Sequence, residues 1–123
     1  PTKAKCPLSA LDKATSPVKI NIWYAGLTGE TLKVMKKMVA DFNASQDKVV
    51  ATANNQGQSY EENLRKYEGA SSKPSQLPQV IYVEDTALGE MVDKGQVLPA
   101  QSCMEADDYD PTQITLWVRH THT

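Results

Sequence analysis

The sequence is poor in the residue types that carry much of protein chemistry. Only two of its 123 residues are cysteine and only two are histidine. Two cysteines are too few for a small fold built on disulfides. Both histidines, His120 and His122, belong to the last four residues of the chain. Because a catalytic triad needs a histidine inside the domain, the sequence does not favour that class of enzyme.

Familiar catalytic and nucleotide-binding motifs are missing as well. The chain contains no Cys-x-x-Cys, no Gly-x-Ser-x-Gly, no P-loop and no Gly-rich dinucleotide fingerprint. The terminal His-x-His pair has a spacing that can bind a metal, but an irregular tail is its simpler interpretation. We therefore expect a protein that is not an enzyme and that uses no cofactor.

The chain also lacks an excess of one charge and a long apolar run. Lys and Arg number 13 against 15 Asp and Glu, and the net charge is -2. No basic surface for a nucleic-acid backbone is expected from this balance. No apolar run approaches the ~18 residues that a membrane span needs. With 40% apolar residues, a chain of this length predicts a single domain with its own core.

What the sequence does contain is an alternation of strand and helix patterns. Alternating, β-branched stretches predict strands, and apolar residues at a spacing of three to four predict helices. In the first helix this stripe consists of Leu32, Met35, either Met38 or Val39, and Phe42. The expected strands are 18–23, 48–53 and 79–83. The first expected helix begins at 30, the second runs from 60 to about 67, and the third begins at 85 or 86 and ends at 95.

This order predicts an α/β fold with a parallel, doubly wound sheet. The strand at 79–83 is apolar almost throughout, which is typical of a buried parallel strand. Ligands of such sheets bind outside the carboxyl ends of the strands. The loops at 23–29, 54–60 and 83–86 are therefore the expected binding region.

Five residues in these loops are candidate ligand contacts. Trp23 ends the first strand and Tyr60 begins the second helix, while Glu84 and Asp85 follow the third strand. A tyrosine offers a ring face and a hydroxyl, and a carboxylate accepts hydrogen bonds from sugar hydroxyls. Gly29 lies where a helix opens directly after a strand, a possible anion site. Packing for Trp23 and helix capping for Asp85 are the simpler alternatives.

The flanks of the chain are less regular than its middle. Residues 1–17 show no period, and residues 115–123 read TLWVRHTHT. Ser102 and Glu105 have the spacing of a capping box. Cys6 lies in the N-terminal flank and Cys103 in the non-periodic stretch after the third expected helix. They are two ordinary thiols in a reducing compartment or a disulfide in an exported protein. A disulfide closing so long a loop would contribute about 4–5 kcal/mol in the chain-entropy model.

The run from Val18 to Tyr67 resembles the start of a mature extracellular solute-binding protein of an ATP-binding-cassette importer, of the family 1 type used for sugars and glycerol phosphates. The resemblance rests on a strand ending in Trp, the motif D-F-N-A-S-Q, a valine-rich strand and N-x-G-x-x-Y-E-E, in that order. The strand at 79–84, the segment GQVLPAQSC and the turn Asp108-Tyr109-Asp110 continue it.

The resemblance implies the β-α-β-α-β start of lobe 1 of a type II periplasmic-binding-protein clamshell, with the second lobe absent. Residues 18–114 would be this partial lobe, residues 1–17 an N-terminal extension and residues 115–123 a tail that does not match. Tyr60 matches the family's ligand-contacting tyrosine and Glu84 its acidic residue at a strand end. Trp23, Gly26 and Gly29 fall in the first cleft loop.

The resemblance also implies a cellular setting. Cys6-Pro7 and Gln101-Ser102-Cys103 are similar to actinobacterial members, which implies a Cys6–Cys103 disulfide and an exported protein whose signal peptide has been removed. The partners would be a small solute (a sugar, a polyol or a phosphate ester) and a membrane permease. Because only part of the cleft is present, we expect this fragment to self-associate through exposed apolar surface.

A flavodoxin-like electron carrier is the alternative from another functional class. The segment from Ile20 to Thr31 also resembles the loop that binds the phosphate of FMN in flavodoxins. Gly26 replaces the first hydroxyl of that loop, and Glu30 places a negative charge beside the phosphate position. An α/β interaction domain without a ligand is the third possibility.

Overall fold

The computed structural model describes residues 6–113. The expected tail at 115–123, with His120 and His122, lies outside the described residues. The chain divides into two compact units. One is the continuous segment Thr15–Leu88, and the other combines the residues before it with those from Gly89 onward. Each unit is described by itself.

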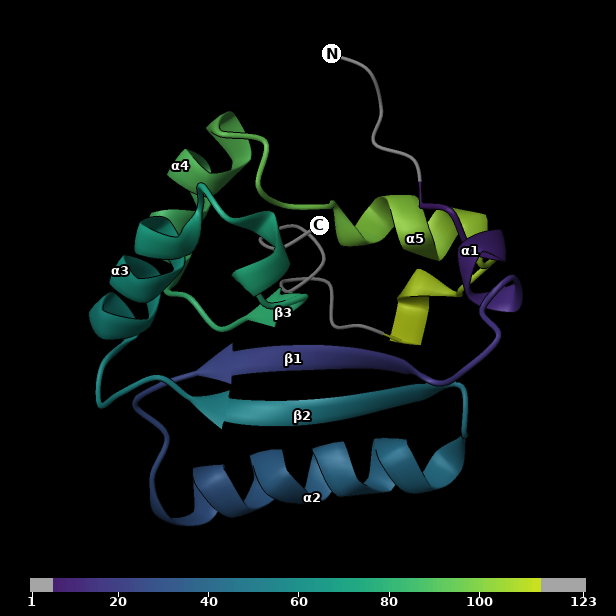
Figure 1. Cartoon of the computed structure of the whole chain (residues 1–123), viewed down its shortest axis with the longest axis horizontal. Coiled ribbons are helices and arrows are strands. Elements are labelled where there is room, and N and C mark those ends of the chain that lie inside the picture. The colour runs from purple at the N-terminus through teal and green to yellow at the C-terminus, as the bar shows by residue number, and fades with distance from the viewer. Residues whose placement is uncertain (1–5, 114–123) are drawn as a thin grey trace. The chain divides into compact units, whose positions relative to one another are not determined.

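The first unit is built on a three-stranded parallel sheet (Figure 1). Its strands are β1 (Val18–Tyr24), β2 (Val49–Asn55) and β3 (Val80–Ile81), in the order β2-β1-β3. The predicted alternation of strands and helices in a parallel α/β fold is thereby confirmed.

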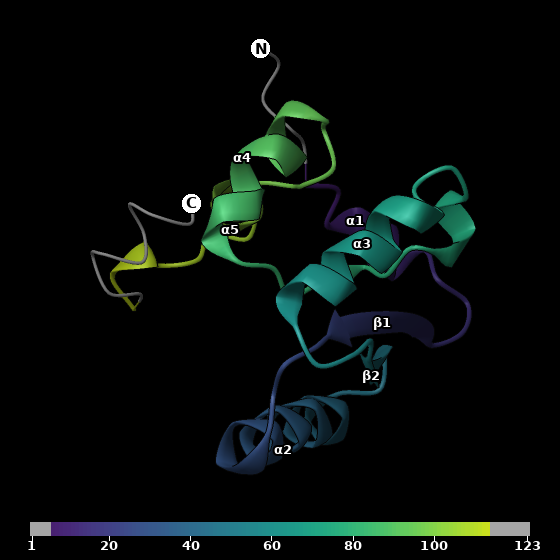
Figure 2. The same ribbon diagram turned by 90° about the vertical axis from the view of Figure 1, so that its left-hand side faces the viewer.

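Two helices lie on opposite faces of this sheet. In Figures 1 and 2, α2 (Gly29–Ser45) lies on one side of β1 and β2, and α3 (Tyr60–Ala70) lies on the other. The first expected helix and the second are thus both present, and α3 extends three residues past its predicted end at Tyr67. Tyr67 is buried, as its place on the inward face predicts.

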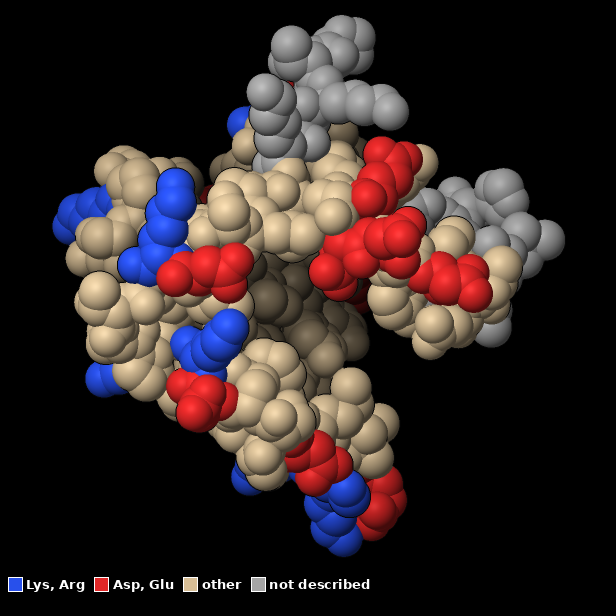
Figure 3. Space-filling view, turned by 90° about the vertical axis from the view of Figure 1, so that its right-hand side faces the viewer, with Lys and Arg blue, Asp and Glu red and all other residues tan. Residues whose placement is uncertain are grey.

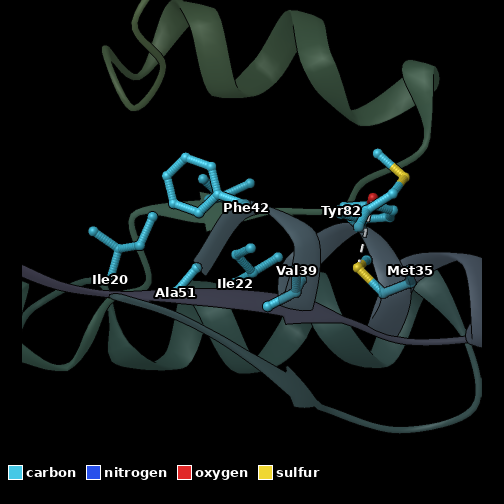
Figure 4. Close-up of a pocket in the computed structure, with 9 residues that line it drawn as sticks. Ile20, Ile22, Met35, Val39, Phe42, Ala51 and Tyr82 are labelled. Carbon is cyan, nitrogen blue, oxygen red and sulfur yellow. Dashed lines mark hydrogen bonds between the residues drawn. The ribbon is translucent and has the colours of Figure 1, made fainter. Parts of the chain in front are cut away.

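The face toward α2 carries apolar side chains from every second residue of β1. Ile20 and Ile22 of β1 and Ala51 of β2 meet Met35 and other residues of α2 around a wholly apolar cavity of about 280 Å³ (Figure 4). Met35 is buried, and Val39 rather than Met38 turns toward the sheet. This packing is the main apolar seam between α2 and the sheet.

Two apolar side chains that were predicted to be buried are exposed instead. Phe42 is 41% and Val80 is 43% exposed. Met38 is 62% exposed, and Val39, its alternative in the predicted stripe, is half-buried. The third strand, β3, has two residues and lies at an edge of the described sheet, so Val80 has a neighbouring strand on one side only.

The outer edge of β2 is closed along its first half by side chains of α2 and its C-cap. Asn43 donates from Nδ2 to the Ala51 carbonyl (2.9 Å) and accepts from the Ala51 N–H (2.8 Å). Gln46 makes the same pair of bonds with Val49, both at 2.7 Å. Because alternate residues of β2 face β1, the backbone groups of Val49 and Ala51 point away from the sheet. The two carboxamides take the place of a neighbouring strand.

Helix α3 begins with the predicted cap. Ser59 accepts a hydrogen bond at Oγ from the Glu62 N–H (3.2 Å). The Glu62 carboxylate reaches back to the N–H of Gln58, one residue before the expected partner. It occupies the space beside Gly57, where a Cβ would collide with it and where φ is 148°. The positive φ therefore favours glycine at position 57, and a side chain there would displace the Glu62 carboxylate from the Gln58 N–H.

The second unit is held by a disulfide between Cys6 and Cys103, whose Cα atoms lie 5.0 Å apart. It contains α1 (Ser9–Asp12) and α5 (Ala100–Ala106), while α4 (Asp85–Asp93) crosses the boundary between the units. Short 3-10 turns occur at Pro74–Gln76 and Pro111–Gln113.

The N-terminal stretch contains the short helix α1, which its lack of an apolar period did not indicate. Nearer the C-terminus one expectation was wrong. The capping box at Ser102 and Glu105 does not form, because α5 begins at Ala100 after Pro99 and includes Ser102. Pro99 fixes the backbone just before this helix, so the helix begins at Ala100 and not after Ser102. None of the described helices is long and apolar enough to cross a membrane.

Candidate functional site

A cavity of about 200 Å³ lies at the carboxyl end of the sheet, between the start of α3 and the residues after β3. The side chains around it come from two segments whose nearest lining residues are 19 positions apart in the sequence. The lining residues are Tyr60, Glu61, Leu64, Val83, Glu84, Thr86 and Ala87. This is the region where parallel α/β sheets bind ligands.

Backbone hydrogen bonds hold the first two loops of this edge together. The Gln56 N–H donates to the Tyr24 carbonyl (2.7 Å), which extends the ladder between β1 and β2 by one rung. The Gly26 N–H donates to the Gly57 carbonyl (3.3 Å). At Gly26 φ is 74° and a Cβ would lie 3.3 Å from the Gln58 carbonyl oxygen. The close approach of these loops therefore favours glycine at position 26.

The structure brings together two of the five residues that the sequence singled out. Tyr60, half-buried, and Glu84, exposed, line the same cavity. Trp23, Gly29 and Asp85 are not among its lining residues. Asp85 is instead the first residue of α4, where the positive end of the helix dipole stabilises a carboxylate.

Gly29 and the residue before it serve the start of α2. Thr28 is the N-cap residue, and its carbonyl accepts from the Leu32 N–H and the Thr31 hydroxyl. Glu30 forms an ion pair with Lys33 at 2.9 Å. The arrangement is that of an ordinary helix start with a carboxylate beside it.

The charge around the cavity is acidic. Glu61 and Glu84 are its two charged lining residues, and neither lysine nor arginine is among them. On the face drawn in Figure 3, acidic side chains gather in one area, and some basic side chains lie beside acidic ones while others stand apart. Glu105, Asp107 and Asp108 are exposed, as expected for an acidic turn.

Sequence reasoning missed Asn63, the fully buried polar side chain of α3. It lies one turn after Tyr60 and one turn before Tyr67, on the inward face of the helix. A polar residue at an inward position was the available signal. It also missed Glu61 as a lining residue, because a carboxylate in the first turn of a helix has a sufficient explanation in capping.

Comparison with protein-family models, with curated proteins and with solved structures gives no match. Among residues 6–113, no group of three or more histidine, cysteine, aspartate or glutamate residues is placed to hold a metal ion. The chemistry of the site therefore has to be judged from the cavity itself.

The cavity is suited to binding through hydrogen bonds and one aromatic ring. Its carboxylates are acceptors, the Tyr60 hydroxyl is a donor and an acceptor, and the Thr86 hydroxyl is both as well. Leu64, Val83 and Ala87 supply apolar contacts. At about 200 Å³ it is smaller than complete small-molecule sites, which measure roughly 300–1,000 Å³. It is large enough for one ring or for part of a longer ligand.

Proposed function

We propose that this chain is the substrate-binding component of an ATP-binding-cassette importer and that it captures a carbohydrate or a polyol. The observation that carries the proposal is the cavity at the carboxyl end of the sheet, where Tyr60 and Glu84 lie together. The same two residues correspond to ligand contacts in the solute-binding proteins that the sequence resembles.

The acidic lining supports an uncharged, hydroxyl-rich solute over a phosphate ester. Glu61 and Glu84 would repel a phosphate, and no basic side chain of the lining would offset that repulsion. Hydroxyl groups donate to carboxylates in hydrogen bonds that are stronger than those between neutral groups. The ring of Tyr60 offers a flat apolar face for a sugar ring.

The disulfide supports export. A Cys6–Cys103 bond persists in oxidising compartments and is rare in the reducing cytosol. On this proposal the chain works outside the cytoplasm and delivers its solute to a membrane permease.

Exposed apolar surface supports self-association as a further part of the proposal. Val34, Met38 and Phe42 are 56%, 62% and 41% exposed along one side of α2. We expect a dimer or a higher oligomer, and light scattering at increasing concentration tests it. A single monomeric species at high concentration would contradict this part alone.

Calorimetric titration tests the proposed function. The panel consists of maltose, glucose, glycerol and glycerol 3-phosphate, each titrated into the disulfide-bonded protein. We expect heat of binding with a sugar or with glycerol and none with glycerol 3-phosphate. Binding of none of the four would contradict the proposal. Visible flavin absorbance of the purified protein would favour the electron carrier instead.

A further inference from the structure

Asn63 of α3 is a polar side chain with no exposure to solvent, and it is the fully buried polar residue of the described chain. Burying a carboxamide is unfavourable unless its donors and acceptors are hydrogen-bonded. Its environment therefore has to be accounted for atom by atom.

The two donors of Asn63 join two strands where they separate. Nδ2 donates to the Trp23 carbonyl (3.2 Å) and to the Tyr82 carbonyl (2.8 Å). These carbonyls are neighbours, because the Tyr82 N–H also donates to the Trp23 carbonyl (2.9 Å). Beyond this point the chain from β1 enters the loop at 25–28 and the chain from β3 continues to Glu84.

The helix that carries Asn63 also carries the opposite wall of the cavity. Tyr60 precedes Asn63 by three residues, so the two stand on neighbouring turns of one face. Val83 and Glu84 directly follow Tyr82, whose carbonyl Asn63 holds. The Asn63 amide therefore connects the element bearing Tyr60 to the strand end bearing Glu84.

We propose that Asn63 is the positioning residue of the ligand cavity: its amide fixes the distance between Tyr60 and Glu84 by clamping α3 onto the Trp23 and Tyr82 carbonyls. This inference rests on the proposed function for its role in binding. Leucine, which has a similar size, would leave both carbonyls without this donor. Aspartate would place an acceptor against them.

Oδ1 of Asn63 is buried and accepts no hydrogen bond from a described residue. The two hydrogen bonds that Nδ2 donates are therefore the polar contacts that hold this side chain in place.

Asn43 provides a matched control. It is also an asparagine of a helix that packs on this sheet, and its carboxamide also makes two hydrogen bonds with backbone groups. Both of its bonds go to Ala51 at the outer edge of β2, and Ala51 is not among the residues that line the cavity. Asn63→Leu and Asn43→Leu thus each remove two comparable bonds, and only Asn63→Leu touches the strand ends at the cavity.

The experiment measures amide hydrogen exchange by NMR and binding of the four titration probes for the wild type and both variants. We expect Asn63→Leu to speed exchange of two amides by about tenfold or more relative to the rest of the sheet: that of Tyr82, which donates to the Trp23 carbonyl, and that of Gly26, which donates to the Gly57 carbonyl. We expect it to weaken binding of the probe that the wild type takes by about tenfold. Asn43→Leu should speed exchange at Ala51 and leave binding within about twofold.

The outcomes separate this inference from the proposed function. If the wild type binds no probe, the proposed function fails, and the exchange rates of the Tyr82 and Gly26 amides still decide whether Asn63 holds the strand ends. Unchanged exchange in folded Asn63→Leu, or equal loss of binding in both variants, would overturn the positioning role. If Asn63→Leu does not fold, Asn63→Ser, which keeps one donor, replaces it and should lie between wild type and full loss.

Discussion

The helices on the two faces of the sheet each use an asparagine, and they use it for different purposes. On α2, Asn43 donates to and accepts from one residue, Ala51, and so completes the edge of a single strand. On α3, Asn63 donates to two carbonyls and joins the ends of two different strands. The same type of side chain thus completes the outer edge of β2 from α2 and joins the two strand ends beside the cavity from α3.

The packing around the two helices differs in the same way. Helix α2 rests on an apolar seam of Met35, Ile20, Ile22 and Ala51, with polar bonds at its end. Helix α3 has a buried polar group at its centre. We infer that substitutions on the α2 face change mainly stability, while substitutions at the α3 face change mainly ligand binding. The predictions below test this division.

Removing the disulfide should have the largest effect, and it should affect both faces alike. Replacing Cys6 and Cys103 by serine opens a loop of 97 positions and should lower the free energy of unfolding by about 4–5 kcal/mol. Urea unfolding followed by circular dichroism measures the change. The wild type in a reducing agent is the control and should match the variant. A midpoint that does not move would show that the bond constrains little in the unfolded chain.

Next in size is the apolar seam under α2. Met35→Ala should lower the free energy of unfolding by about 2–4 kcal/mol, because it removes buried side-chain volume. Lys36→Ala is the control on the same helix: its side chain is exposed, and the substitution should change stability by less than about 0.5 kcal/mol. Equal losses in urea unfolding would contradict the role of Met35 in the buried seam.

Substitutions at the edge of β2 should lower the free energy of unfolding by less, but they should clearly increase self-association. Replacing both Asn43 and Gln46 by alanine removes four hydrogen bonds to Val49 and Ala51. We expect a loss of about 2 kcal/mol and greater association than the wild type, because an open strand edge pairs with other strands. Analytical ultracentrifugation measures the association. Asn54→Ala, which removes a bond to Asn21 instead, should associate no more than the wild type.

The smallest effect on stability belongs to the cavity, where binding should change instead. Glu84→Gln should weaken binding of the sugar probe by about tenfold through the loss of a charged acceptor. Unfolding should change by less than about 0.5 kcal/mol because the side chain is exposed. Asp85→Asn, the adjacent carboxylate outside the lining, should bind like the wild type in the same titration. If Asp85→Asn weakened binding instead, the site would include the start of α4.

The spacing of apolar residues and the pattern of helix-cap residues made the strands and helices of the sheet unit predictable from the sequence. The alternation in β1 and the stripe of α2 are local signals. Both elements form where expected and Met35 is buried, but Phe42 of the stripe is 41% exposed. The Ser59 cap is also a local pattern, and it starts α3 where expected. The length of β3 and the exposure of Val80 were not predictable in this way, because they depend on how many neighbouring strands the sheet provides.

The cavity was predictable only in its location. The carboxyl ends of parallel strands indicated the edge, and Tyr60 and Glu84 were named for their chemistry. Asn63 was missed because its partners, the Trp23 and Tyr82 carbonyls, are backbone groups that leave no mark on the sequence. The sequence shows an asparagine between two tyrosines of one helix, but it does not show which groups that asparagine binds.

The disulfide has a consequence for how the chain responds to cutting. The sheet unit, Thr15–Leu88, lies entirely inside the covalent ring that Cys6 and Cys103 close. A single protease cut in the exposed turn at 71–73 would therefore leave one molecule of unchanged mass apart from the added water. Two fragments would separate only after reduction. The chain can thus be nicked at its surface and still keep both halves of its sheet within reach of each other.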